Sequence, residues 1–320
     1  MDDWFKITNK ILENNHINIS IEKRLYLSFT DDENSKVDKN IIFEELQKNG
    51  ILNNDPRIKQ FIANLKIIVK TSMISFEEFK YCINSNVVLV KDILQRKLII
   101  PYFHRFTEKI EEIYYKTKEL NGGKCADYIP QLKRVDPEHY GISICTIDGQ
   151  RFNIGDTNID FTTQSCCKPI NYGIALEELS EEIYHKYVGR EPSGQSFNEI
   201  ALNKNGLPHN PLINSGAIMT SSLIKKELSA SERFEYIVSI WDKLCGGIHK
   251  IGFNNAVYLS EKNTADRNFA LAYFMKEINE NKQTGFPEGS NINDTLDLYF
   301  QCCSIEINTD ILATVASTLA

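Results

Sequence analysis

Residues 160–176 read Asp160-Phe161-Thr162-Thr163-Gln164-Ser165-Cys166-Cys167-Lys168-Pro169-Ile170-Asn171-Tyr172-Gly173-Ile174-Ala175-Leu176. The first four residues are typical of an extended segment, and the run from Lys168 onward is typical of a helix. Ser165 therefore lies at or next to the start of a helix, where serine is a favoured cap. Lys168 follows three residues later, on the same helix face and one turn away.

This Ser-x-x-Lys spacing is compatible with nucleophilic catalysis. A buried lysine near the positive end of a helix has its charged form disfavoured, so its neutral amine can take the proton of a nearby serine. The spacing alone is weak, because Ser20-x-x-Lys23 and Ser222-x-x-Lys225 match it equally well. A helix-capping serine followed by a lysine that extends toward solvent is the alternative for all three matches.

Residues 1–120 are expected to form an α-helical domain. Ile58, Phe61, Ile62, Leu65, Ile68 and Val69 recur at the spacing of one helix face. Asn49-Gly50 follows a helix, and Ser75-x-x-Glu78 is a capping box. The acidic stretch from Asp31 to Asn34 resembles a calcium loop, but Val37 stands where such a loop requires glycine. We expect an EF-hand-like arrangement without a calcium loop.

Residues 121–320 have a different texture, with glycines, prolines and one clear hairpin. Gly141 to Ile147 alternates, Asp148-Gly149 supplies a tight turn, and Arg151 to Ile154 leads away. A two-stranded hairpin is marginal alone, and everything after Gly155 is expected to be helical or looped. The sequence therefore predicts an α+β protein in which part of the sheet is missing.

Composition excludes several classes of function. The 320 residues carry a formal net charge of −7, which gives no attraction to nucleic acid or to anionic lipid. The apolar runs are far shorter than the ~20 residues that cross a bilayer. The start of the chain lacks the composition of a transit peptide. Eight cysteines without C-x-x-C spacing favour free thiols, and no metal site is expected.

Several further motifs occur in a fixed order along the chain. They are Ala126-Asp127-Tyr128-Ile129-Pro130-Gln131-Leu132, Asp148-Gly149-Gln150-Arg151, Gln164-Ser165-x-x-Lys168-Pro169, Tyr187-Val188-Gly189-Arg190-Glu191-Pro192-Ser193-Gly194, Pro208-His209-Asn210-Pro211, Ile213-Asn214-Ser215-Gly216-Ala217, Tyr258-Leu259-Ser260-Glu261, Ala265-Asp266-Arg267-Asn268 and Tyr299-Phe300-Gln301. In this order they resemble the glutaminase family, whose fold is that of the serine β-lactamases and penicillin-binding proteins. The helical region resembles the domain that precedes the catalytic one in animal kidney-type glutaminases.

The resemblance implies roles for named residues. Ser165 would be the nucleophile, Lys168 its general base, and Tyr128 a proton shuttle toward departing ammonia. The substrate's amino acid end would be bound by Asn214, Glu261, Asn268 and Tyr299, with Gln164 fixing the approach to the helix. Without the resemblance, Tyr128 is a packing residue of a loop, Asn214 a turn residue, and Glu261 a partner of the helix dipole.

The resemblance also implies the wider biology. The expected reaction is the hydrolysis of L-glutamine to L-glutamate and ammonia through a glutamyl-serine intermediate, by a homo-oligomer (dimer or tetramer), without a cofactor and with phosphate as an activator. The expected compartment is the mitochondrion, with the cytosol as the alternative. The segment Phe197 to Leu202 departs from the family's basic, aromatic regulatory loop at Glu199 and Ala201, which puts phosphate regulation in doubt.

Family members continue past the residue that corresponds to Ala320, so the chain is expected to be truncated at its carboxyl end. One alternative is therefore a catalytically inactive subunit or interaction partner of a full-length glutaminase. Another is a penicillin-binding or β-lactamase-type acyl-transferase, which shares Ser-x-x-Lys. The chain lacks a Ser-Asp-Asn triplet at a suitable distance, which argues against that class.

Overall fold

The computed structural model describes residues 19–30, 34–67, 72–84, 86–247, 250–282 and 285–320. Most of the acidic stretch considered as a calcium loop lies outside the described residues, and so do the start of the chain and Ile68-Val69. The described chain separates into two compact units by its internal contacts. The first contains the residues up to Asn121 together with Gly141–Gly155, and the second contains Gly122–Tyr140 and Asp156–Leu319.

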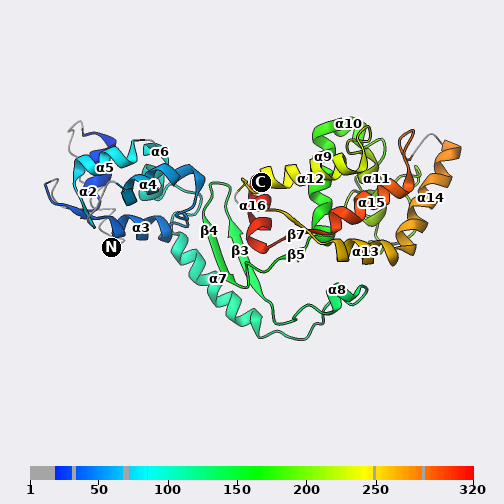
Figure 1. Ribbon diagram of the computed structural model, residues 1–320, viewed down its shortest axis with the longest axis horizontal. Coiled ribbons are helices and arrows are strands. Elements are labelled where there is room, and N and C mark those ends of the chain that lie inside the picture. Colours follow the sequence, from blue (N-terminus) through cyan, green and yellow to red (C-terminus); the bar gives the residue numbers. More distant parts are fainter. Residues whose placement is uncertain (1–18, 31–33, 68–71, 85, 248–249, 283–284) are drawn as a thin grey trace. The chain divides into compact units, whose positions relative to one another are not determined.

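The first unit is mainly helical (Figure 1). Its elements are α2 (Ile21–Leu27), β1 (Val37–Asp38), α3 (Lys39–Lys48), η1 (Pro56–Ile58), α4 (Lys59–Ile67), β2 (Met73–Ile74), α5 (Phe76–Ile83), α6 (Val87–Leu94), α7 (Phe103–Lys118), β3 (Gly141–Cys145) and β4 (Arg151–Gly155). The capping box of Ser75 and Glu78 is confirmed at the start of α5. Tyr26, Phe61 and Phe79 are fully buried in the core of this unit.

A short antiparallel pair in the first unit was not predicted. Strands β1 and β2 pair Val37 with Ile74. Each strand is only two residues long, so no alternating pattern can reveal it. The pair joins segments on either side of helices α3 and α4, which is how the helical unit acquires a small sheet.

The predicted hairpin is confirmed as β3 and β4, which pair in antiparallel register from Gly141 and Gly155 to Cys145 and Arg151. Gly149 has a φ of +83° in the connecting turn, a conformation that favours glycine. The sequence placed this hairpin with residues 121–320, whereas its contacts group it with the helical unit.

The reason for that grouping is hydrogen bonding over long sequence distances. The Gln150 side chain is fully buried and donates to the carbonyl oxygens of Asn49 and Ile100, at 3.1 and 3.0 Å. The Arg57 guanidinium donates to the Asp148 carbonyl oxygen at 2.6 Å. A boundary between domains at residues 120 and 121 remains a prediction.

The second unit combines helices with a three-stranded sheet (Figure 1). Its elements are α8 (Pro130–Lys133), β5 (Phe161–Thr162), η2 (Gln164–Cys166), α9 (Cys167–Leu179), α10 (Glu181–Tyr184), α11 (Asn214–Leu223), α12 (Ala230–Leu244), β6 (Gly252–Phe253), α13 (Asn255–Asn263), α14 (Asp266–Lys282), α15 (Ile292–Cys303), β7 (Ile305–Ile307) and α16 (Thr309–Leu319). Tyr184, Trp241 and Phe300 are fully buried in its core.

The sheet of the second unit corrects the expectation that everything after Gly155 is helical or looped. Its strand order is β5-β7-β6, and both pairings are antiparallel. Strands of two or three residues leave no periodic pattern in the sequence. Only their backbone pairing in the folded chain, with β7 between β5 and β6, identifies them as strands. Helices together with antiparallel sheets confirm the α+β class.

Candidate active site

Ser165 lies in the 3₁₀ turn η2, directly between strand β5 and helix α9. The preceding segment is fixed by Thr163, which is 1% exposed. The Thr163 hydroxyl donates to the Cys302 carbonyl oxygen at 2.7 Å, and its backbone N–H donates to the Ile305 carbonyl oxygen at 2.8 Å. Both acceptors belong to the end of α15 and the start of β7, so the turn that carries Ser165 is attached to the core of the unit.

The backbone immediately before Ser165 is strained. Gln164 has a φ of +45°, in the left-handed region that residues other than glycine, asparagine and aspartate seldom adopt. Such conformations persist only where the surroundings enforce them, and they concentrate at functional sites. Ser165 directly follows this residue, and its side chain is exposed.

The structure distinguishes the three Ser-x-x-Lys matches. Ser20 is the N-cap of α2 and its hydroxyl accepts from the Lys23 backbone N–H at 3.3 Å. Ser222 is buried in α11, where its hydroxyl donates to the Met219 carbonyl oxygen at 2.6 Å. Ser165 caps no helix, because neither η2 nor α9 has a side-chain cap bond. The capping interpretation therefore applies to Ser20 and not to Ser165.

Lys168 is 4% exposed in the first turn of α9. Its Nζ donates to the Asn214 side-chain oxygen at 2.7 Å, and it lies 5.9 Å from the centre of the Phe197 ring. Burial lowers the Lys168 pKa from its ordinary value of 10.5. A lowered pKa enlarges the fraction of neutral amine, which is the form able to accept a proton.

Asn214 is the first residue of α11, which corrects its interpretation as a turn residue. Its amide group donates to the Asn268 side-chain oxygen at 3.0 Å. Lys168, Asn214 and Asn268 thus form a continuous hydrogen-bonded chain from α9 through α11 to α14. Its members lie 46 and 54 residues apart in the sequence.

A second cluster joins Tyr128, Gln164 and Glu261. The Tyr128 hydroxyl lies 2.7 Å from a Glu261 carboxylate oxygen and 3.1 Å from the Gln164 side-chain oxygen. Glu261 is 9% exposed and lies in α13, so it is not a first-turn partner of the following helix. Burial raises the Glu261 pKa above its ordinary value of 4.5, and the bond from Tyr128 opposes that rise.

Tyr128 as a whole is exposed, but its contact with Glu261 is partly buried. This partial burial and the Glu261 carboxylate both raise the Tyr128 pKa, so Tyr128 keeps its proton. Tyr299 is 5% exposed in α15, and burial raises its pKa as well, followed by the influence of Cys303. A phenol that stays protonated is a hydrogen-bond donor rather than a base.

The structure thus places seven of the eight predicted site residues in two hydrogen-bonded clusters and one short turn. The eighth, Tyr299, is related to them through charge effects that reach it from Glu261 and Tyr128. Sequence reasoning did not single out Thr163 as the anchor of the turn. It also missed the Phe197 contact with Lys168. The Phe197 carbonyl oxygen accepts from the Asn214 backbone N–H at 2.9 Å, a long-range bond with no local sequence signal.

Comparison with known proteins adds a direct assignment. The sequence profile of the glutaminase family matches residues 123–320. The chain belongs to the glutaminase family. A profile described as an EF-hand domain matches residues 21–101, which accords with the expected EF-hand-like helical region.

Curated relatives among the glutaminases cover most of the chain. The mitochondrial liver isoform of glutaminase from Rattus norvegicus is 40% identical over 279 residues, which are 86% of this chain and 45% of that protein. Putative glutaminase 3 of Caenorhabditis elegans is 42% identical over 308 residues, 93% of this chain and 52% of that protein. The chain therefore spans about half the length of these curated relatives.

A solved structure gives the same assignment. The structure of ybaS, a probable glutaminase, superposes with a TM-score of 0.61 at 31% identity, covering 67% of each chain. In the part of the chain that the structure describes, no helix is both long and apolar enough to cross a membrane.

Proposed function

We propose that this glutaminase-family chain carries the machinery that hydrolyses L-glutamine to L-glutamate and ammonia through a glutamyl-Ser165 intermediate. The observation that carries the proposal is the pairing of an exposed serine, on a strained turn, with a buried lysine in the next helical turn. Burial favours the neutral amine of Lys168, which is the base that an unactivated serine hydroxyl requires.

The reaction proceeds in two balanced halves. Ser165 Oγ attacks the carbon of the side-chain amide while Lys168 Nζ takes the hydroxyl proton. The proton then passes to the amide nitrogen, the carbon–nitrogen bond breaks, and ammonia leaves the glutamyl ester. A water molecule attacks this ester, Lys168 takes a proton from the water, and Ser165 Oγ recovers a proton as glutamate departs.

Tyr128 supports the leaving of ammonia as a donor. Its raised pKa keeps the hydroxyl protonated, so it can give a hydrogen bond to the nitrogen or relay a proton without accumulating as a phenolate. Its place in the hydrogen-bonded cluster with Gln164 puts it beside the residue that precedes Ser165.

The remaining predicted residues suit the amino acid end of glutamine. Glu261 is a buried carboxylate, and the substrate ammonium group would offset the cost of its burial. Asn268 accepts from Asn214, which leaves its own amide N–H groups free to donate to the substrate carboxylate. Tyr299 supplies a further protonated hydroxyl.

The test is ammonia release from L-glutamine by the full-length protein and its Ser165→Ala variant. We expect the variant to lose almost all activity, while Ser20→Ala, a change at a serine that only caps a helix, leaves the rate within about two-fold. Mass spectrometry of the enzyme quenched during turnover would show a glutamyl adduct on Ser165. Full activity in Ser165→Ala would exclude the proposed nucleophile.

Assembly, regulation and compartment are proposals by similarity. We propose a homo-oligomer, a mitochondrial location because two relatives carry that word in their names, and phosphate as an activator. Sedimentation analysis, localisation of the tagged protein and activity titrated with phosphate test these separately. A cytosolic signal or a phosphate-insensitive rate would contradict the corresponding proposal.

A further inference from the structure

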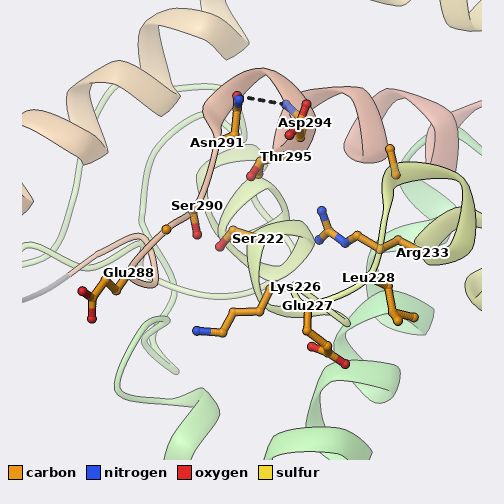
Figure 2. Close-up of a pocket in the computed structure, with 12 residues that line it drawn as sticks. Ser222, Lys226, Glu227, Leu228, Arg233, Glu288, Ser290, Asn291, Asp294 and Thr295 are labelled. Atoms are coloured by element: carbon orange, nitrogen blue, oxygen red, sulfur yellow. Dashed lines mark hydrogen bonds between the residues drawn. The ribbon is translucent and has the colours of Figure 1, made fainter.

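A cavity of about 290 Å³ opens in the second unit. It is formed by the end of α11, the segment leading into α12, and the segment leading into α15. Figure 2 shows Arg233, Ser222 and Ser290 around one space, with Lys226 and Glu288 farther out. No site residue identified above lines this cavity.

Arg233 is the buried cation of the cavity, at 7% exposure. Its Nε donates to the Ile224 carbonyl oxygen at 2.9 Å, and its Nη2 donates to the Ser221 carbonyl oxygen. Within the described residues it forms no ion pair with a carboxylate. Burial lowers the Arg233 pKa. The carboxylates of Asp294, Glu227 and Glu178 act on this charge without forming an ion pair with it. Among the described residues Nη1 makes no hydrogen bond, so this edge of the guanidinium can donate to a ligand.

A second, independent observation concerns Ser290. Its hydroxyl is buried and has no hydrogen-bond partner. Buried hydroxyls normally have one, so the exception calls for an acceptor or donor that occupies the cavity. A guanidinium edge and an unpartnered hydroxyl on one cavity are suited to a bound oxyanion, above all a carboxylate.

The rim of the cavity restricts which anion fits. The lining contains three exposed carboxylates, those of Glu227, Glu288 and Asp294. Its one exposed cation is Lys226. The three carboxylates repel a doubly charged anion such as phosphate, and they attract an ammonium group. A ligand with a single carboxylate and an adjacent ammonium satisfies both the buried and the exposed charges.

We propose that this cavity binds a free α-amino acid, with its carboxylate on Arg233 and Ser290 and its ammonium group toward Asp294. The site is distinct from the candidate active site, although helix α11 reaches both. Asn214 is the first residue of α11, and Ser222 lies eight residues later, roughly 12 Å along the helix. The proposal does not depend on glutamine hydrolysis.

The test is isothermal titration calorimetry of the 320-residue chain with glycine, acetate, methylammonium and inorganic phosphate. Glycine is the probe because it carries both charged groups and no side chain. We expect glycine to bind more tightly than each of the other three. Absence of glycine binding, equal binding of acetate, or tighter binding of phosphate would overturn the proposal.

Two variants locate the binding. Ser290→Ala removes a hydroxyl that has no partner in the empty cavity, so the protein should fold normally and bind glycine about ten-fold more weakly. Ser239→Ala is the matched control, because its hydroxyl donates to the Tyr236 carbonyl oxygen within α12. Asp294→Asn should weaken glycine binding and strengthen acetate binding. Glycine affinity unchanged in both Ser290→Ala and Asp294→Asn would place the ligand elsewhere and refute the proposal.

Discussion

The hydrogen bond between Tyr128 and Glu261 should contribute more to stability when Glu261 is charged. The two oxygens lie 2.7 Å apart, and Glu261 is 9% exposed. A double-mutant cycle of Tyr128→Phe, Glu261→Met and the double variant isolates this bond, because phenylalanine has no hydroxyl to donate and methionine has no oxygen to accept it.

The size of the effect follows from burial and charge. A hydrogen bond to a charged group contributes about 1.5–3 kcal/mol, and Tyr128 is 55% exposed, so we expect the lower end, about 1.5 kcal/mol at about pH 7.5. At about pH 4, below the ordinary carboxyl pKa of 4.5, both partners are neutral. The coupling should then fall to about 0.5–1 kcal/mol.

The pH dependence of the wild-type protein has a definite sign. Burial raises the pKa of Glu261, so the folded state binds its proton more tightly than the unfolded state. The stability due to Glu261 is complete below pH 4.5 and is lost as the pH rises through the raised folded-state pKa. Tyr128→Phe removes a bond that lowers this pKa. In that variant the stabilising contribution of Glu261 should therefore persist to a higher pH.

The assay is urea unfolding of the four proteins at both pH values, followed by circular dichroism and by fluorescence of the buried Trp241. Tyr273→Phe serves as the control, since Tyr273 has similar exposure, 53%, without a hydrogen bond among the described residues. A coupling below about 0.3 kcal/mol at about pH 7.5, or the same coupling at both pH values, would show that the charge on Glu261 does not strengthen this bond.

Three further predictions concern the same unit. Activity should rise with pH as Lys168 loses its proton, at a pKa below 10.5. Lys168→Met should lower kcat by about 10²–10⁴-fold. A pH profile of kcat that does not rise in this way would contradict the role of Lys168 as a base. Gly216→Ala should destabilise the protein, because the new Cβ would lie 1.9 Å from the Asn210 backbone oxygen. This clash outweighs the preference of helices for alanine, which is about 1 kcal/mol. A raised Tm of the variant would contradict the prediction. Thr163→Val should cost about 1 kcal/mol, because it removes the hydroxyl that donates to the buried Cys302 carbonyl oxygen, which keeps only the Ser304 backbone N–H. An unchanged urea midpoint would show that the Thr163 hydroxyl does not anchor the turn.

Local sequence patterns predicted the elements with strong local signals. The capping box at Ser75, the hairpin turn at Gly149 and the change from strand to helix around Ser165 all appear in the structure. Each depends on neighbours within a few residues, and such interactions are visible in a one-dimensional pattern.

The strands of the second unit were not predictable in the same way. Strands β5, β6 and β7 are two or three residues long, and their identity depends on pairing across more than fifty residues. The hairpin was predicted correctly, yet its grouping with the helical unit depends on Gln150, whose buried amide meets partners about fifty and one hundred residues away.

By itself, the sequence determined the family and the residue types of the candidate site, because motifs in a fixed order carry both. The Ser-x-x-Lys spacing alone could not choose among Ser20, Ser165 and Ser222, and the neighbouring family motifs pointed to Ser165. Tertiary structure shows how the surroundings of the three serines differ. Only folding buries Lys168 against Asn214, strains the backbone at Gln164 and leaves Ser165 exposed, and burial and strain depend on contacts between residues that are distant in the chain.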